Sequence, residues 1–485
     1  MYEVFQRCFS FVKSAVARPP ELTNGRSIGS FKGLAVLGAL WAFCSPVAQG
    51  QTSFRVLSNF NVADGSAPRF VSLVQGTDGN LWGTTAAGGT GCTDCGTIYK
   101  ISPSGTLSVV YNLNESSGYD PAVGLTLSTS GDFYGVGGLS AGGFGTVFKI
   151  TGSGALTVLR NFDNTNGNDP EGALTQGTDG NFYGTTNFGG SDDVGTVFKI
   201  TPGGTLTTLQ SFDVDNGAYP YGQLVQGTDG SFYGVTEEGG DLECSNGGCG
   251  TVFKITPGGV FTLLHSFSGS DGEFPVGGLV QGENGDFYGT TMEGGAFSIG
   301  TVFEITSSDT FTSLLSFGGA NEGGEPLAPL IQATDGNFYG TTYYGTVFQL
   351  TPAGGLRTMF AFSDGKEDGQ SPEGGLVQDT NGTFYGVTYR GGQYDHGVVY
   401  SLNTGLGPFV KTLPTFGTAG AVVKILGTNL TGATSVTFNG VVATFTVVSS
   451  SLITTTVPTG ATNGKVQVVT PGGTLTSNVP FRVLP

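Results

Sequence analysis

The sequence is poor in the residues that most often carry acid–base and metal chemistry. Its 485 residues include only 2 His and 6 Cys, and charged residues make up 12% of the chain. Ser-His-Asp and Cys-His catalysis both need a histidine base, and the two histidines are the only residues that could supply one. His265 falls on an outer strand of a repeat and His396 in a loop, and both are expected to be structural or solvated. We assign no catalytic residue from the sequence.

Positive charge is scarce as well. The chain has 19 Lys+Arg against 37 Asp+Glu, a net charge of −18. Phosphate backbones would be repelled by this charge, which argues against nucleic acid as a partner. Cations, neutral sugars and basic protein surfaces stay open as ligands.

No apolar run is long enough to cross a membrane. The longest, residues 33–43, is shorter than the roughly 20 residues of a spanning helix. It follows several Lys and Arg residues and precedes Ala48-Gln49-Gly50, an order typical of a secretory signal. We expect residues 1–50 to direct export and the mature protein to have no membrane span.

Glycine and aromatic residues are abundant, with 86 Gly, 36 Phe and 17 Tyr. Together with many β-branched residues they predict numerous short strands joined by tight turns. One unit, Asp179 to Thr186 followed by Gly195 to Ile200, organises the chain. Its aromatic-Gly step recurs seven times at intervals of 46 to 55 residues, at Trp82, Tyr134, Tyr183, Tyr233, Tyr288, Tyr339 and Tyr385.

Each copy is predicted to fold as four antiparallel strands. Asp179-Gly180 is a favoured hairpin turn between the first two strands, and Pro202-Gly203-Gly204 joins the last two. Seven such sheets of about 50 residues predict a seven-bladed β-propeller over residues 51–404. The last copy lacks its fourth strand, whereas residues 54–60 match the fourth strand of the second copy, residues 156–162. The N-terminal strand should therefore close the last blade and leave no open edge.

Positions that repeat in every copy are expected to be architectural. Gln176 and its equivalents should satisfy backbone groups beside the Asp-Gly turns. The variable segments, between the second and third strands and between copies, lie on one face and should form the working surface. This face is rich in acids and aromatic rings. The candidate binding residues on it are Phe188, Tyr219, Tyr221, Glu237, Glu238, Tyr343, Tyr344, Tyr389 and Tyr394.

Two resemblances support this organisation. The units Pro170 to Ile200 and Pro275 to Ile305 resemble the bacterial GloVer tandem repeat, which implies an exported, often surface-associated protein. Residues 405–485 are rich in Thr and Val and contain the hairpin signal Asn439-Gly440, which predicts a small immunoglobulin-like β-sandwich. Its segments Ile425 to Asn429 and Thr470 to Gly473 are similar to IPT/TIG domains, which generally carry no catalytic residues of their own.

The remaining chemistry lies in loops. Cys92 with Cys95 and Cys244 with Cys249 are expected to form two local disulfides, because exported chains oxidise such pairs. We predict no metal site. The acids at 163–169 and 213–217 offer oxygen ligands that suit Ca²⁺, but turn-forming Asx residues explain them as well.

These observations predict an exported binding or adhesion protein that recognises an extracellular glycan or a surface protein through its variable face. One alternative is a carbohydrate-active enzyme, a glycosidase or lyase, that uses loop carboxylates such as Glu237 and Glu238. A structural component of a surface layer or matrix is a third possibility.

Overall fold

The computed structural model describes residues 52–90, 92, 95–121, 123–138, 142–240, 244, 247–319, 322–363 and 366–484. The expected export signal, residues 1–50, lies outside this described part. The described residues belong to one compact unit, Gly50–Pro485. They form β-strands and one short 3-10 helix, η2 (Lys366–Asp368). No helix among them has the length and hydropathy that a membrane span requires.

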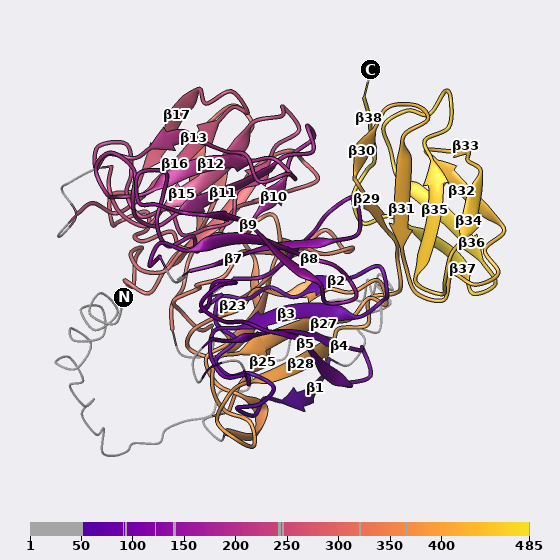
Figure 1. Ribbon diagram of the computed structural model, residues 1–485, viewed down its shortest axis with the longest axis horizontal. Helices are drawn as coiled ribbons and strands as arrows, with labels where there is room; N and C mark the ends of the chain where they lie inside the picture. The colour runs from indigo at the N-terminus through magenta and orange to yellow at the C-terminus, as the bar shows by residue number, and fades with distance from the viewer. Residues whose placement is uncertain are drawn as a thin grey trace, which may run out of the picture. The chain divides into compact units, whose positions relative to one another are not determined.

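Residues 53–403 form seven four-stranded antiparallel sheets (Figure 1). Sheet 1 contains β2 (Val74–Gln75), β3 (Leu81–Thr85), β4 (Thr97–Ile101) and β5 (Leu107–Asn112). Sheet 2 contains β6 (Thr126–Leu127), β7 (Phe133–Gly137), β8 (Thr146–Ile150) and β9 (Leu156–Asn161). Sheet 3 contains β10 (Thr175–Gln176), β11 (Phe182–Thr186), β12 (Thr196–Ile200) and β13 (Leu206–Ser211). Sheet 4 contains β14 (Val225–Gln226), β15 (Phe232–Thr236), β16 (Thr251–Ile255) and β17 (Phe261–Ser266).

The remaining three sheets repeat this order. Sheet 5 contains β18 (Val280–Gln281), β19 (Phe287–Thr291), β20 (Thr301–Ile305) and β21 (Phe311–Ser316). Sheet 6 contains β22 (Ile331–Gln332), β23 (Phe338–Thr342), β24 (Thr346–Leu350) and β25 (Leu356–Ala361). Sheet 7 contains β26 (Val377–Gln378), β27 (Phe384–Thr388), β28 (Val398–Asn403) and, as its fourth strand, β1 (Ser53–Asn59).

The N-terminal strand pairs as the sequence match predicts. β1 runs antiparallel to β28, from the pair Ser53 and Asn403 to the pair Asn59 and Val398. Phe54 on this strand stacks on Phe360 of sheet 6, with ring centroids 3.9 Å apart. The two ends of the repeat region therefore share one sheet, and that sheet also packs against its neighbour.

Neighbouring sheets stack face to face through aromatic rings. The second strand of each sheet is buried along its whole length, so a large side chain meets a sheet on either side. The ring pairs are Trp82–Phe133, Tyr134–Phe182, Tyr183–Phe232, Tyr233–Phe287, Tyr288–Phe338 and Tyr339–Phe384, with centroids 3.8 to 4.4 Å apart. Tyr385 of sheet 7 shares a core cluster with Leu81 of sheet 1. The sheets thus follow one another in a propeller-like arrangement.

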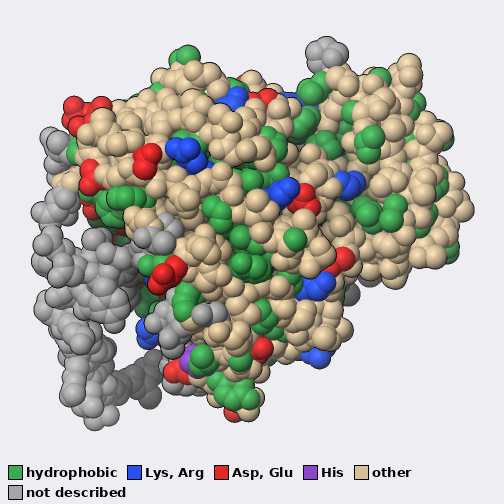
Figure 2. Space-filling view, in the orientation of Figure 1, with side chains coloured by type: hydrophobic (Ala, Val, Ile, Leu, Met, Phe, Trp, Pro, Cys, Tyr) green, Lys and Arg blue, Asp and Glu red, His purple; other side chains and the backbone are tan. Residues whose placement is uncertain are grey.

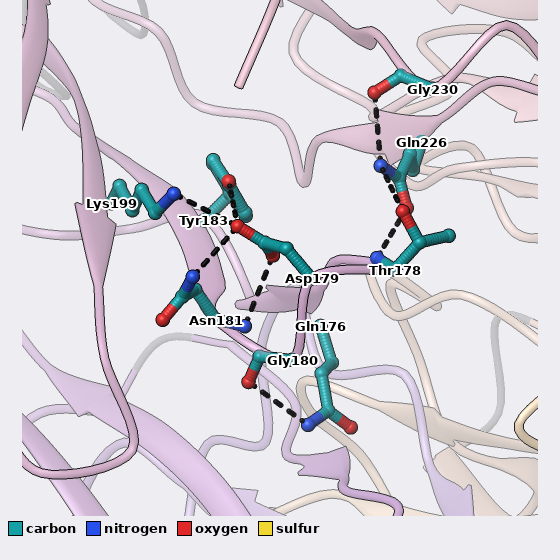
Figure 3. Close-up of polar contacts among 9 residues, drawn as sticks. All are labelled: Gln176, Thr178, Asp179, Gly180, Asn181, Tyr183, Lys199, Gln226 and Gly230. Atoms are coloured by element: carbon teal, nitrogen blue, oxygen red, sulfur yellow. Dashed lines mark hydrogen bonds and ion pairs between the residues drawn. The ribbon is translucent and has the colours of Figure 1, made fainter. Parts of the chain in front are cut away.

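The Asp-Gly turns carry a repeated polar network (Figure 3). Gln226 donates to its own turn at the Gly230 carbonyl, at 2.9 Å, and its amide oxygen accepts from the Thr178 N–H of the preceding sheet, at 2.9 Å. Asp179 binds Lys199 at 2.8 Å, and the hydrogen bonds from Lys199, Asn181 and Tyr183 outweigh burial and lower the pKa of this carboxyl to about 2. The glutamines therefore satisfy turn groups, as predicted, and they also join neighbouring turns.

Residues after 404 form a separate β-layered region. One sheet has the order β29 (Lys411–Leu413), β31 (Val422–Leu426), β35 (Leu452–Thr456) and β34 (Phe445–Val447). The other has the order β33 (Val441–Val442), β32 (Ser435–Phe438), β36 (Val466–Thr470) and β37 (Gly473–Thr476), and β30 (Phe416–Gly417) pairs in parallel with β38 (Arg482–Val483). Val423, Ile425, Val436, Phe438 and Ile453 lie in its core. Its first strand meets the turn region, where Lys411 donates to the Gln378 carbonyl at 2.6 Å.

Charged side chains are sparse on the molecular surface. Figure 2 shows acidic and basic groups scattered among uncharged side chains over the face in view. This distribution agrees with the low charged fraction of 12%. Clustered charge is therefore informative wherever it occurs.

Candidate binding site

A tight turn at a proline begins every sheet. The residue before this proline has a positive φ of 53 to 57° in all seven sheets, at Ala67, Asp120, Asp169, Tyr219, Phe274, Glu325 and Ser371. A non-glycine residue adopts this conformation uncommonly, so the turn is a defined feature of the repeat. The carbonyl of the residue before the proline accepts a hydrogen bond from the N–H of the residue that follows the second strand. In sheet 3, the Asn187 N–H donates to the Asp169 carbonyl oxygen at 2.9 Å.

Each sheet thereby brings three variable positions together, one on either side of the proline and one after the second strand. In sheet 3 these are Asp169, Glu171 and Asn187, and in sheet 4 they include Tyr221 and Glu237. The flanking glycines and Thr residues recur in nearly every copy, whereas these positions differ. We use the name acidic cluster for Arg69, Asp120, Asp169, Glu171, Asn187, Tyr221, Glu237 and Glu373.

The acidic cluster joins side chains from five sheets. Arg69 of sheet 1 forms an ion pair with Asp120 of sheet 2, at 3.1 Å, and also interacts electrostatically with Glu171 of sheet 3. Phe70 of sheet 1 contacts Tyr221 of sheet 4, with ring centroids 6.3 Å apart. Sheets that are not neighbours can meet only where all of them converge. The acidic cluster therefore lies toward the common centre of the sheets.

Burial makes the carboxylates of the cluster unusual. It raises the pKa of Glu171, which also feels the charge of Asp169, and a hydrogen bond with Tyr221 only partly opposes this. Burial likewise raises the pKa of Asp169, with a further contribution from Asp120. Burial raises the pKa of Glu373 to about 7 and, with the charge of Glu238, that of Glu237 to about 8. These four carboxyl groups gain protons far more readily than solvated acids do.

Several polar atoms of the cluster have no hydrogen-bond partner within the described part of the chain. They are Oδ1 of Asp169, Oε2 of Glu171, Oδ1 of Asn187 and Nε of Arg69. Asp169, Glu171 and Asn187 are 3%, 5% and 5% exposed. Buried polar groups are almost always paired, so these atoms make the cluster a candidate binding site.

Part of the predicted binding face belongs to this centre. Tyr221 hydrogen-bonds Glu171, and Glu237 lies within electrostatic range of Tyr221. Tyr389 is an electrostatic neighbour of Arg69 and lies below the guanidinium of Arg390, 5.0 Å from its ring centroid. Two of the predicted binding residues, Tyr221 and Glu237, therefore belong to the acidic cluster, and their role in binding stays a prediction.

The other candidates lie in smaller groups. Tyr343 and Tyr344 are neighbours with ring centroids 6.3 Å apart, and the Tyr344 hydroxyl donates to Glu325 at 2.8 Å. Tyr343 lies within electrostatic range of Glu373, which connects this pair to the cluster. Phe188 packs against Tyr219, with centroids 5.3 Å apart, and Glu238 lies within electrostatic range of Tyr219. Tyr394 is half exposed and makes no ring contact with the other candidates among the described residues.

The cluster also contains six residues that were not candidate binding residues from the sequence: Arg69, Asp120, Asp169, Glu171, Asn187 and Glu373. All six occupy the variable positions at the proline turn or after the second strand. A comparison of the repeats could have identified the position after the proline as a candidate. Four copies carry Arg69, Glu171, Tyr221 or Glu373 there, whereas the other three have Ala122, Val276 and Leu327.

The loop cysteines form the predicted disulfides. Cys92 is bonded to Cys95 and Cys244 to Cys249, each with Cα atoms 5.5 Å apart. Cys244, Cys249 and Glu273 are the one group of three potential metal ligands within 4.8 Å among the described residues. Its sulfurs are consumed by the disulfide, so it lacks the thiolates that a metal would need.

The acids proposed as Ca²⁺ ligands act within their own turns. Asp213 accepts from the Asn216 N–H at 2.9 Å, and Asp163 accepts from the Thr165 hydroxyl at 2.7 Å. His265 pairs with Asp271 at 3.0 Å and stacks on Phe311, with ring centroids 3.7 Å apart. These groups are held by structural contacts.

The chain belongs to the Gloeobacter/Verrucomicrobia repeat family, which it matches over residues 30–246 and 242–451. No curated protein matches it. Among solved structures it is similar to the WD40 β-propeller domain of Doa1, with 12% identity, a TM-score of 0.47, and coverage of 72% of this chain and 97% of that one. It is also similar to PorZ, a surface component of the type-IX secretion system of Porphyromonas gingivalis, with 12% identity, a TM-score of 0.45, and coverage of 85% and 59%. A third is XC5397, a gluconolactonase from Xanthomonas campestris, with 11% identity, a TM-score of 0.35, and coverage of 57% and 91%.

Proposed function

We propose that this protein is an exported binding protein that recognises a glycan at the acidic cluster and the tyrosines beside it. In this proposal the seven sheets are the blades of one closed propeller, and residues 405–485 form an immunoglobulin-like module of the IPT/TIG type. The two disulfides support an oxidising, extracellular location. The pairing of β1 with β28 supports closure of the ring.

The observation that carries the proposal is the set of buried, unpartnered acceptors on Asp169, Glu171 and Asn187. Sugars supply many hydroxyl donors, and such acceptors can fix their orientation. Tyr343 and Tyr389 border the same cluster through Glu373 and Arg69. Aromatic rings beside polar groups suit a sugar, whose faces are apolar and whose rim is polar.

A glycan array followed by calorimetry tests this proposal. The purified protein should bind a defined glycan, and the double variant Tyr343→Ala/Tyr389→Ala should lose about tenfold or more in affinity, because aromatic anchors dominate binding energy. Val260→Ala is the control, since this exposed side chain lies in the turn before β17 and outside the predicted binding face. Normal binding by the double variant, or an array without any ligand, would refute the proposed site and favour a structural role.

A carbohydrate-active enzyme is the second candidate, and the raised pKa of Glu237, to about 8, favours it. A carboxyl group that is protonated at neutral pH can act as a general acid toward a glycosidic oxygen. Release of reducing ends from the bound glycan, abolished in Glu237→Gln, would establish turnover, and binding without release would exclude it.

A further inference from the structure

The sheet 3 part of the acidic cluster presents acceptors to its ligand. Asp169 and Glu171 flank Pro170, and Asn187 is hydrogen-bonded to the Asp169 carbonyl, so the three side chains leave neighbouring backbone. One oxygen of each side chain has no partner within the described residues, and each residue is at least nine-tenths buried. Burial raises the pKa of both carboxyl groups, which favours their protonated forms unless a cation is bound. With a cation bound, both groups are carboxylates, which accept hydrogen bonds and donate none, so the ligand group that fits this state is a donor.

Negative charge also exceeds positive charge around these acceptors. Arg69 is the cation that reaches these carboxylates among the described residues, and its Nη2 atom already binds both carboxylate oxygens of Asp120, at 3.1 and 3.2 Å. Asp169 and Glu171 therefore share one guanidinium that is paired elsewhere. Buried carboxylates are stabilised by a partner of opposite charge, so a cationic group would complete this site.

We propose that Asp169, Glu171 and Asn187 bind the primary ammonium group of an amino sugar whose nitrogen is not acetylated. This inference rests on the glycan-binding function proposed above and names the class of sugar. An ammonium group has three N–H donors and no acceptor, which matches three unpaired oxygens. The charge-assisted bonds to Asp169 and Glu171 would be the strong ones.

Two observations favour an amino sugar over other cations. No three carboxylates of the cluster place their oxygens within 4.8 Å of one another among the described residues, whereas Ca²⁺ needs six or more oxygens close together. Tyr221 donates to Glu171 beside the acceptors, and its ring packs against Phe70. An aromatic surface next to an ammonium pocket suits a sugar ring that carries an amine.

Isothermal titration calorimetry with two oligosaccharides tests the inference. At pH 6, where sugar amines are protonated, the purified protein is titrated with β-1,4-linked glucosamine hexamer and with the N-acetylated hexamer of the same ring and linkage. We expect the free amine to bind about tenfold more tightly, as charge-assisted bonds predict. Asp169→Asn and Glu171→Gln should each reduce this preference, and the double variant should abolish it.

The matched control is Asp215→Asn, an exposed acid in the loop before sheet 4, which should keep the preference. Thermal melting of each variant separates loss of fold from loss of the site, and a variant that melts early is replaced by Asn187→Leu. Equal binding of both hexamers, or binding of neutral glycans alone, overturns the ammonium site and leaves the glycan-binding function standing. If a lysine peptide competes at equal affinity, the site belongs to a protein ligand, and the proposed amino-sugar site is overturned as well. Absence of binding to every glycan overturns both.

Discussion

Glu373 keeps a carboxyl group almost wholly out of water, with 7% of the residue exposed. Burial raises its pKa to about 7, although Arg69 and Arg390 lower it. The folded state therefore binds this proton more tightly than the unfolded chain does. A raised carboxyl pKa contributes stability below the unfolded pKa of 4.5, and this contribution is lost as pH rises through 7.

Glu373→Gln should remove a pH dependence of roughly 2–3 kcal/mol between pH 4.5 and 7, so the variant should be more stable than wild type at pH 8. Denaturant unfolding at pH 5 and pH 8 measures it. Glu367→Gln, at an exposed carboxyl, serves as the control. A variant that loses as much stability as wild type on raising the pH would contradict the assignment.

At the scale of the element, the aromatic-Gly step explains why the second strand tolerates no side chain at its centre. A Cβ atom at Gly184 would lie 2.7 Å from Cζ of Phe198 and 2.9 Å from Cδ2 of Leu174. The same conflict with a third-strand ring recurs at Gly234, Gly289 and Gly340. The glycine is therefore required by packing within each sheet, and it says nothing about ligand binding.

Gly184→Ala should consequently destabilise the protein by about 1–3 kcal/mol, the usual cost of overpacking a core. Gly203→Ala provides the control, because its nearest neighbour would be Oγ1 of Thr201 at 3.8 Å. Thermal and denaturant unfolding of the two variants distinguish them. Equal melting would mean that the core adapts around the extra methyl group.

At the scale of the whole molecule, one strand from the start of the repeat region completes the last sheet. β1 supplies the pairing edge of β28, and Phe54 packs against Phe360, Phe362 and Tyr400. Without β1, the β28 edge would be open to another chain. The stability of the repeat region therefore depends on a strand distant in sequence.

Phe54→Ala should lower the free energy of unfolding by roughly 2 kcal/mol, since the phenyl ring of Phe54 is partly buried. Arg55→Ala, at the exposed neighbouring position, should change it little. Light scattering near the melting temperature should show association of Phe54→Ala before that of the control. Identical behaviour would show that the repeat region tolerates an unanchored first strand.

The amount that sequence alone could predict differs between fold and site. Strands, turns and the pairing of β1 were predictable because each copy carries local signals, such as Asp179-Gly180, and because seven copies could be aligned. The disulfides were predictable because each pair is close in sequence. No cluster was predicted, and only its members Tyr221 and Glu237 were candidates. The other members, Arg69, Asp120, Asp169, Glu171, Asn187 and Glu373, come from four different repeats, and no local signal shows that they meet.

The sequence by itself determined an all-β chain of repeated antiparallel sheets, because turn chemistry and alternating burial act over a few residues. Only the tertiary structure decided that Arg69 pairs with Asp120 and that Glu171 meets Tyr221, because these contacts depend on how separate sheets converge. It also decided which acids are buried. A carboxylate on a variable loop reads the same in sequence whether it is solvated, like Asp215, or enclosed, like Asp169. Burial is the property that turns such an acid into a candidate for binding.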